Sequence, residues 1–316
     1  MLLDTHAQVI VVTHHHKNRV GIRYLAPGLK VYHIPHVTLT SSASLPNYLL
    51  FLPHIRTILL REGVDVVHGH ATLSSLAHEA IHHAPLFGVR TCFTDHSLFG
   101  FADAVGVLTN KLLASALRNV DAAICVSNTG RENTALRAEI EPERVNVIPN
   151  ALVPSQFRPD PARASSEYSE LNPSPQLTLV TIVVIARLVY RKGIDLLVAS
   201  APQICDMFPD VRFIVGGDGP KMVDLLQMRE KYELQDRIEL VGSVRPADVR
   251  GLLTRGHIYL NTSLTEAFGI SIIEAASAGL FVVSTRVGGV PEILPADMIE
   301  FARADEDGKK QPNSTC

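Results

Sequence analysis

The segment 187–193 gathers three positive side chains, Arg187, Arg191 and Lys192, and contains no acidic residue. An apolar run that predicts a strand precedes it, and a helical pattern follows it. A strand-to-helix turn offers free backbone N–H groups and the positive end of the helix dipole, so Arg187 and Lys192 at this turn suit a diphosphate. Taken alone, the segment is explained more simply as a solvated basic turn.

The second candidates are the two glutamates that begin and end the segment EAFGISIIE. Glu266 is expected in the turn before a helix, and Glu274 about 12 Å further along at ~1.5 Å per residue. Carboxylates so placed could hold hydroxyls at opposite ends of a nucleotide sugar. The amides of Phe268, Gly269 and Ile270 would meet the phosphates between them. The alternative is a helix start that favours acidic residues, followed by one surface glutamate.

Histidine is the third residue type that could do chemistry, and thirteen of the fourteen histidines lie before residue 97. The run 14–16 and the pair His78 and His82 suggest a metal, since a four-residue spacing puts two imidazoles on one helical face. The sequence does not place a complete ligand set with either group, so we expect no bound metal. His68 and His70 end a predicted strand.

Length and composition bound the class of protein. With 316 residues, 46% hydrophobic and 19% charged, the chain is predicted to form about two domains with sizeable cores. A formal net charge of −3 argues against a nucleic-acid-binding protein, which needs a clear basic excess. The four cysteines lack metal-ligand spacing and favour a reducing, cytosol-facing environment. They are Cys92, Cys125, Cys205 and Cys316.

Two stretches of alternating strands and helices would position these residues. The first predicts strands at 8–13, 64–68, 89–94, 121–126 and 144–148, with helices at 49–61, 73–83, 108–117 and 129–138. The second predicts strands at 179–185, 211–216, 238–241, 257–261 and 281–284, again interleaved with helices. Buried strands separated by helices are typical of a parallel doubly wound sheet. We therefore predict two Rossmann-like domains that face a ligand-binding cleft.

Composition also predicts the domain boundaries. Five prolines and a polar stretch within 151–176 are typical of a linker. The prediction is an N-terminal domain at 1–150, the linker at 151–176, a C-terminal domain at 177–301 and a polar tail at 302–316.

Both ends of the chain are predicted to be incomplete. Residues 8–13 have the pattern of a second strand, so the first strand and its glycine-rich loop are expected before Met1. The N-terminus has Asp4 and His6 where a signal peptide would be basic or apolar. The longest apolar run, 177–186, is about half of the ~20 residues that a membrane-spanning helix needs. No targeting segment or membrane anchor is therefore predicted in this chain.

Together and in this order, the basic turn and the two glutamates resemble the retaining glycosyltransferases of the two-domain GT-B type. The segments GGDGP at 216–220, AASAG at 275–279 and GGVPE at 288–292 follow the same order. Longer stretches, such as FTDHSLFGFAD at 93–103 and LTNKLL at 108–113, are similar to one family of this type. That family is the catalytic subunits of phosphatidylinositol N-acetylglucosaminyltransferase, and the resemblance extends from Gln8 to Phe301.

The resemblance implies a role for each candidate residue. Arg187 and Lys192 would neutralise the diphosphate of UDP as it leaves. Glu266 would contact the donor sugar or its phosphate side, and Glu274 the ribose hydroxyls. His96, at the end of a first-domain strand, would stabilise the reaction centre, since in such enzymes the donor phosphate itself takes the acceptor proton.

The resemblance also implies the reaction, which is transfer of N-acetylglucosamine from UDP-GlcNAc to phosphatidylinositol with retention at the anomeric carbon. This is the first step of GPI-anchor biosynthesis, and it is expected at the cytosolic face of the endoplasmic reticulum membrane with other subunits of the transferase complex. Gly217 would line the donor site, and no metal or cofactor besides the donor is implied. The alternatives are a GT-B transferase with another donor or acceptor, and an inactive isoform or partner-binding subunit.

Overall fold

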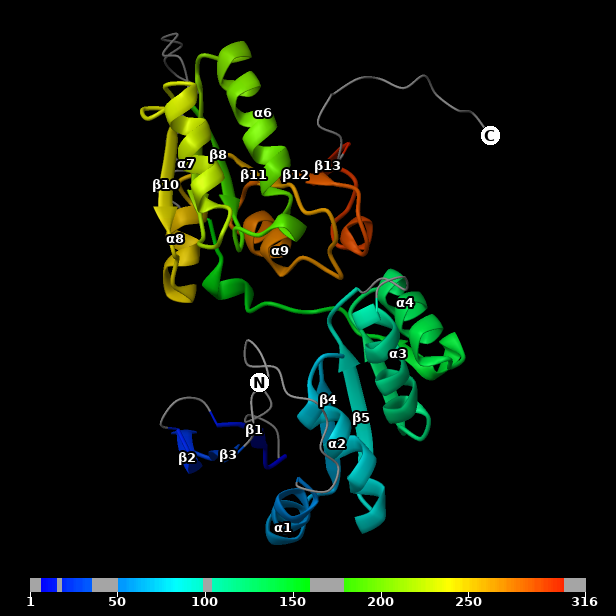
Figure 1. The fold of residues 1–316 in the computed structure, drawn as a ribbon. Helices are drawn as coiled ribbons and strands as arrows, with labels where there is room; N and C mark the ends of the chain where they lie inside the picture. Colours follow the sequence, from blue (N-terminus) through cyan, green and yellow to red (C-terminus); the bar gives the residue numbers. More distant parts are fainter. Residues whose placement is uncertain (1–6, 16–18, 36–50, 99–103, 160–178, 304–316) are drawn as a thin grey trace, which may run out of the picture. The chain divides into compact units, whose positions relative to one another are not determined.

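The computed structural model describes residues 7–15, 19–35, 51–98, 104–159 and 179–303 (Figure 1). The chain divides into two compact units. The first comprises 1–126 and 130–148, and the second comprises 127–129 and 149–316. Part of the predicted linker and most of the predicted tail lie outside the described residues.

The first unit contains two sheets. The smaller has the order β1-β3-β2, with β1 parallel to β3 and β2 antiparallel to it. The larger is a parallel sheet in the order β4-β5-β6-β7. The strands are β1 (Ile10–His14), β2 (Gly21–Ala26), β3 (Leu29–Ile34), β4 (Val66–His70), β5 (Arg90–Asp95), β6 (Ala122–Cys125) and β7 (Val145–Val147).

Within the described residues, β1 pairs only with β3, and β4 pairs only with β5. No described strand joins β1 to β4, so the described residues of the first unit form two separate sheets. The hairpin of β2 and β3 was not predicted, because polar residues interrupt both strands and only Pro27 and Gly28 signal its turn.

Four α-helices pack on these sheets. Tyr32 and Ile34 of β3 share a core with Ile55 and Leu59 of the first helix, and a second core surrounds Phe93 of β5. The helices are α1 (Leu52–Glu62), α2 (Ser75–His83), α3 (Ala104–Leu117) and α4 (Asn128–Ala138). The short 3-10 helices are η2 (Ala84–Phe87) and η3 (Pro142–Arg144).

The second unit has one parallel sheet in the order β10-β9-β8-β11-β12-β13. Its strands are β8 (Val180–Ile185), β9 (Val211–Gly216), β10 (Ile238–Gly242), β11 (Ile258–Asn261), β12 (Phe281–Thr285) and β13 (Ile299–Ala302). The strand order reverses between β8 and β11, and open sheets of this type bind ligands beyond the carboxyl ends of strands at such a point.

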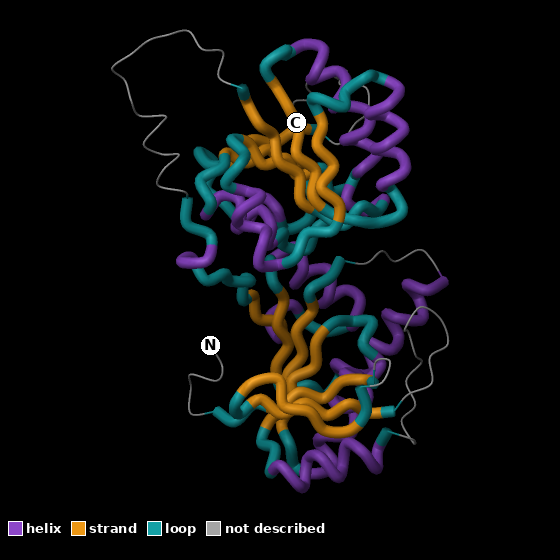
Figure 2. Tube along the Cα trace, turned by 90° about the vertical axis from the view of Figure 1, so that its left-hand side faces the viewer, coloured by secondary structure: helices purple, strands orange, loops and turns teal. Residues whose placement is uncertain are grey.

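Helices cover both faces of this sheet (Figure 2). Ile182 and Val184 of β8 pack with the first two helices on one face, whereas Val183 packs with the other two. This alternation explains the unbroken apolar pattern of the strand. The helices are α6 (Ile194–Met207), α7 (Met222–Lys231), α8 (Val249–Leu253) and α9 (Ile270–Ser277). The 3-10 helices are η4 (Pro154–Gln156), η5 (Tyr190–Lys192), η6 (Pro246–Asp248) and η7 (Val290–Glu292).

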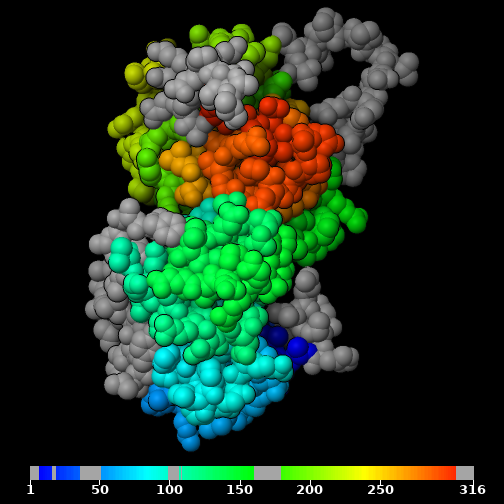
Figure 3. All heavy atoms as spheres, turned by 90° about the vertical axis from the view of Figure 1, so that its right-hand side faces the viewer, coloured from blue at the N-terminus to red at the C-terminus, as the bar shows by residue number. Residues whose placement is uncertain are grey.

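Strand β13 is an addition to the predicted strands. It forms one edge of the sheet, and residues from α9 to β13, coloured orange to red, make much of the second unit's surface on the face drawn in Figure 3. Its sequence, IEFA, is short and contains a charge, as edge strands often do, so it lacked the apolar run used to predict strands. Across the described ranges, no helix has the length and apolar character needed to cross a bilayer.

Candidate functional site

Three loops at the carboxyl ends of neighbouring strands carry most of the predicted site residues of the second unit. The loop after β8, 186–193, lies between the loops that follow β9 and β11. On one side the N–H of Leu188 donates to the carbonyl of Asp218 over 2.9 Å. On the other side the Thr262 hydroxyl donates to the carbonyl of Lys192 over 2.9 Å. Both neighbours therefore hold the basic loop in place.

Two glycines allow these loops to approach so closely. A Cβ atom on Gly193 would lie 1.8 Å from the carbonyl oxygen of Thr262, and one on Gly217 would lie 1.8 Å from that of Ala186. Their φ angles are 63° and 142°, which side chains rarely adopt. Gly217, predicted as a donor contact, therefore also has a packing role.

The structure joins two of the predicted catalytic residues, because Lys192 forms an ion pair with Glu266. Their side chains are 23% and 16% exposed, so the pair is partly shielded from water and still reachable by a ligand. Arg187 is exposed and makes no ion pair with any of the described residues. The basic segment 187–193 contains no acidic residue of its own, and Glu266 in the loop after β11 supplies the acidic partner.

The second predicted glutamate lies close to the same place. Glu274 is half-buried on α9, and burial raises the pKa of its carboxyl above the usual value. Burial also raises the pKa of Tyr259, on β11, and the charges of Glu274 and Glu266 raise it further. Both carboxylates therefore lie near one phenol, whose hydroxyl donates to the carbonyl of Ile185 over 3.1 Å. Sequence reasoning did not identify Tyr259, because a tyrosine in an apolar strand gives no functional signal.

The beginning of α9 provides the predicted backbone amides. Gly269 precedes the helix with φ of 97°, and no side chain caps this end. Phe268 and Gly269 are buried, whereas Ile270 is 44% exposed. Uncapped N–H groups at a helix start suit an anion, as the sequence predicts for this segment.

A cavity of about 530 Å³ lies beside Glu274. Ile270 and Glu274 line it from α9, and apolar residues that include Leu152, Val153 and Val244 line it from other segments. Its volume is within the range of small-molecule sites. Because the sequence predicts a linker at 151–176, the contribution of residues 151–157 to this cavity was not predicted.

In the first unit, the predicted residue His96 lies beside another histidine. The Nδ1 atom of His70 is 3.2 Å from the Nε2 atom of His96, and the two rings are stacked at 13° with centroids 5.5 Å apart. Next to them, Nε2 of His68 is 2.7 Å from the Thr94 hydroxyl. The carboxyl ends of β4 and β5 thus bring three histidines together.

A buried ion pair supports the loop that carries His96. Arg137 and Asp95 have 0% and 1% exposed side chains and approach to 3.3 Å. The hydroxyls of Thr72 and Thr134 donate to the same carboxylate oxygen over 2.7 and 3.2 Å. The other oxygen accepts from the N–H of Ser97 over 3.2 Å. This network, which sequence reasoning missed, fixes the backbone on both sides of His96.

Comparisons with known proteins agree with this arrangement. Residues 14–103 match the family profile described as PIGA (GPI anchor biosynthesis), and residues 173–298 match the profile of glycosyl transferases group 1. The chain is 56% identical over 306 residues to the phosphatidylinositol N-acetylglucosaminyltransferase gpi3 subunit of Schizosaccharomyces pombe, which covers 97% of this chain and 65% of that protein. The chain belongs to this family.

Other members give the same result. The corresponding phosphatidylinositol N-acetylglucosaminyltransferase subunits of Arabidopsis thaliana and Homo sapiens are each 51% identical, over 97% and 94% of this chain. The chain spans 59% to 66% of the length of these three relatives. The resemblance deduced from the sequence motifs is therefore confirmed at the level of the family.

Solved structures support the fold of this family member. Sucrose-phosphate synthase from Thermosynechococcus elongatus superposes with a TM-score of 0.74 at 20% identity, covering 97% of this chain and 79% of that one. Anabaena HepE in complex with UDP and glucose gives a TM-score of 0.67 at 17% identity, covering 88% and 74%. The predicted GT-B fold, with two Rossmann-like parallel sheets, is confirmed.

The histidines that suggested a metal are arranged differently from a metal site. His78 is buried in α2 with its Nε2 atom 2.6 Å from the carbonyl of Thr72, whereas His82 is exposed. Among the residues that the structure describes, no group of three or more His, Cys, Asp or Glu side chains could hold a metal ion. Of the run 14–16, His16 lies outside the described residues.

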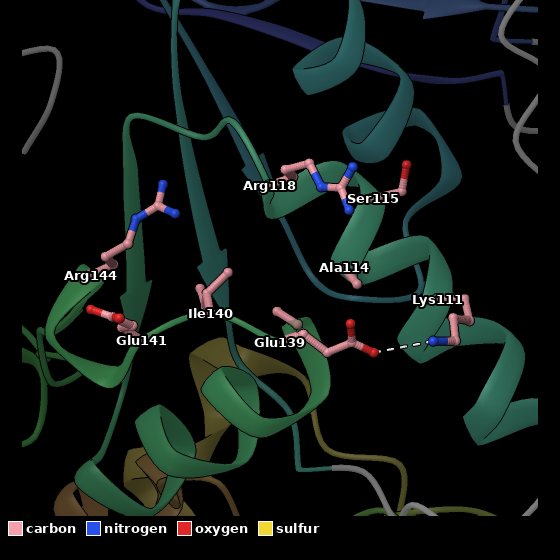
Figure 4. A pocket seen from close by; sticks show the side chains of 9 residues that line it. Lys111, Ala114, Ser115, Arg118, Glu139, Ile140, Glu141 and Arg144 are labelled. Atoms are coloured by element: carbon pink, nitrogen blue, oxygen red, sulfur yellow. Dashed lines mark hydrogen bonds and ion pairs between the residues drawn. The ribbon is translucent and has the colours of Figure 1, made fainter.

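The first unit of this family member has another cavity, of about 510 Å³, lined by α3, the end of α4 and η3 (Figure 4). Its charged side chains have both signs, and Lys111 pairs with Glu139 over 3.1 Å. None of the predicted site residues lines it. The candidate residues of each unit therefore lie in that unit's segments described above, outside this cavity.

Proposed function

We propose that this chain transfers N-acetylglucosamine from UDP-GlcNAc to phosphatidylinositol with retention at the anomeric carbon, the first step of GPI-anchor biosynthesis. The observation that carries the proposal is the contact between Lys192 and Glu266 beside the uncapped start of α9. It occurs in a chain that is 51% to 56% identical to phosphatidylinositol N-acetylglucosaminyltransferase subunits.

The positive loop after β8 would bind the leaving group. Cleavage of the bond between sugar and diphosphate leaves negative charge on the UDP oxygens, so Arg187 and Lys192 would interact more strongly in the transition state than in the ground state. The amides at the start of α9 would add neutral donors to the same phosphates. Lys192 is already oriented by Glu266, which reduces the reorganisation that UDP binding requires.

Each of the two carboxylates would bind a different part of the rest of the donor. Glu266, next to Lys192, would address the sugar, whereas Glu274 would bind the ribose at the rim of the 530 Å³ cavity. The raised pKa of Glu274 reflects partial desolvation, and a carboxylate in such surroundings forms strong hydrogen bonds to hydroxyl groups.

His96 would stabilise the reaction centre, with the donor phosphate taking the proton of the incoming hydroxyl. The acceptor, the other subunits and the place at the cytosolic face of the endoplasmic reticulum membrane follow from the family and are proposals for this chain.

The experiment that tests this function measures transfer of labelled GlcNAc to phosphatidylinositol in membranes of cells that lack the endogenous subunit. A labelled lipid that forms when the chain is expressed, and is absent from the empty control, would support this function. Binding of UDP without transfer would instead support a partner-binding role, and a different labelled product would support another acceptor or donor.

Removal of either positive side chain is expected to weaken UDP binding. Arg187→Ala or Lys192→Ala should lower the binding free energy by about 1.5 to 3 kcal/mol, because each loses a charge-assisted hydrogen bond to phosphate. Isothermal titration with UDP measures this. Lys231→Ala is the matched control, because Lys231 is the last residue of α7 and lies away from the loop after β8. This variant should bind UDP with normal affinity. Unchanged affinity in both site variants would remove the site assignment.

The two glutamates should affect different measurements. Glu266→Gln is expected to lower the transfer rate with little change in UDP affinity, because the glutamine side-chain oxygen can still accept from Lys192 whereas the sugar loses a charged partner. Glu274→Gln should weaken UDP itself, because its partner is the ribose. Parallel titration and transfer assays compare the two variants, and equal effects on both measurements would contradict this division of roles.

A further inference from the structure

We propose that His70 is a positioning residue for His96: the Nδ1–H of His70 donates to Nε2 of His96, which holds the His96 proton on Nδ1. This inference rests on the proposed function, since it assigns a partner to the histidine expected at the reaction centre. It is carried by the contact between the two imidazoles in the first unit.

The parallel pairing of β4 and β5 places these rings together. His70, the last residue of β4, is in register with Thr94, and the N–H of the following residue, Ala71, donates to the Thr94 carbonyl over 3.0 Å. Alternate residues share a face of a strand, so His68 and His70 lie on one face, as do Thr94 and His96. The result is two adjacent cross-strand contacts, His68 with Thr94 and His70 with His96.

A hydrogen bond between two neutral imidazoles needs one N–H and one lone pair. The contact uses Nδ1 of His70 and Nε2 of His96, at 3.2 Å. With Nε2 engaged, only Nδ1 of His96 can address a substrate. Within the described residues His96 forms no other hydrogen bond, so an Nδ1–H of His70 that donates to Nε2 would leave the His96 proton on Nδ1.

The backbone around the pair is held firmly. Asp95 and Ser97, on either side of His96, are joined by a hydrogen bond from the Ser97 N–H to the Asp95 carboxylate. Directly after His70, Ala71 has a φ of 68°, a left-handed conformation that is unfavourable for a residue other than glycine. Thr72 then donates to Asp95. Such strain persists only where surrounding contacts determine the conformation, and here they fix the two loops against one another.

The surroundings of His70 favour its neutral form. Partial desolvation lowers the pKa of His70, and the neighbouring His68 and His96 lower it further. Partial desolvation and His96 similarly lower the pKa of His68. The nearby carboxylate, Asp95, is buried and paired with Arg137. Burial therefore favours the neutral form of His70, which the contact requires, because two doubly protonated rings would direct N–H groups at one another.

The test combines an NMR measurement of the His96 tautomer with the transfer assay. In the chain labelled with ¹⁵N-histidine, ring spectra should show one tautomer for His96 in UDP-free protein. His70→Ala should produce a mixture of tautomers, and His70→Asn should restore a single one, because the Asn side-chain amide occupies nearly the position of the His70 Nδ1 atom. His54→Ala removes an exposed imidazole on α1 and is the control, with an unchanged His96 spectrum.

In membranes, His70→Ala is expected to lower the transfer rate by ~10-fold to 100-fold, as for other partners that orient a functional histidine. UDP affinity should not change, and His70→Asn should recover most of the rate and alter the acid limb of the pH profile. An unchanged His96 tautomer in His70→Ala would overturn the inference, as would full transfer by that variant. The tautomer measurement does not need turnover, so it decides this inference even if the proposed function fails.

Discussion

Asp95→Ala is expected to lower the free energy of unfolding of the first unit by about 3 to 5 kcal/mol. The substitution removes the carboxylate that pairs with the guanidinium of Arg137, whose side chain is 0% exposed. Burial already lowers the pKa of Arg137, whereas the charge of Asp95 raises it, so the carboxylate offsets part of the desolvation. The hydroxyls of Thr72 and Thr134 lose their acceptor as well.

Urea denaturation followed by circular dichroism measures this loss. The transition of the second unit should not move, because Asp95 belongs to the core of the first. The double variant Asp95→Leu and Arg137→Met removes both charges of the pair. It should lower the free energy of unfolding by less than Asp95→Ala alone, because both members of the buried ion pair are then replaced by apolar side chains. A loss below about 1 kcal/mol in Asp95→Ala would mean that water or rearrangement compensates Arg137.

Gly193→Ala and Gly217→Ala are each expected to destabilise the second unit by about 2 to 5 kcal/mol. Each new Cβ atom would lie 1.8 Å from a backbone carbonyl oxygen, which no rotamer change can relieve. The positive φ angles add conformational strain. Because the overlap forces the loop after β8 away from its neighbours, UDP affinity should fall together with stability.

Gly251→Ala is the matched control for these substitutions. Gly251 lies in α8, and a Cβ atom there would meet nothing within 4 Å. Alanine in a helix is favoured over glycine by roughly 0.5 to 1 kcal/mol, so this variant should be slightly more stable and bind UDP normally. Thermal unfolding and UDP titration of the three variants compare them directly. Equal stability of Gly193→Ala and Gly251→Ala would show that the loop can relax freely.

The sequence was sufficient to predict most strands of the second unit, because buried parallel strands are continuous β-branched runs. The predicted strand 211–216 agrees with β9 at both ends. The hairpin of β2 and β3 and the edge strand β13 were missed because their residues are partly polar. Composition and periodicity report burial, and strands at an edge or on an exposed face give a weaker signal.

The site was predictable only in part. Lys192 and Glu266 are 74 residues apart in the chain, and only the family resemblance placed them in one site before the structure showed their contact. The pair of Asp95 and Arg137 could not be predicted, because charged residues are usually exposed and nothing in one sequence marks a buried ion pair. The partnership of His70 with His96 depends on the register of two strands, which the sequence leaves open.

The unpaired sides of β1 and β4 have a consequence for the behaviour of the chain in solution. Among the described strands neither side has a neighbour, and Val11 and Val66 on these strands are 39% and 50% exposed. A row of unpaired backbone groups beside exposed apolar side chains is a template to which another chain can add a strand. Within the described residues, these edges are therefore the places in the first unit where a further segment could add a strand, and a segment that paired with either edge would act as a solubilising partner.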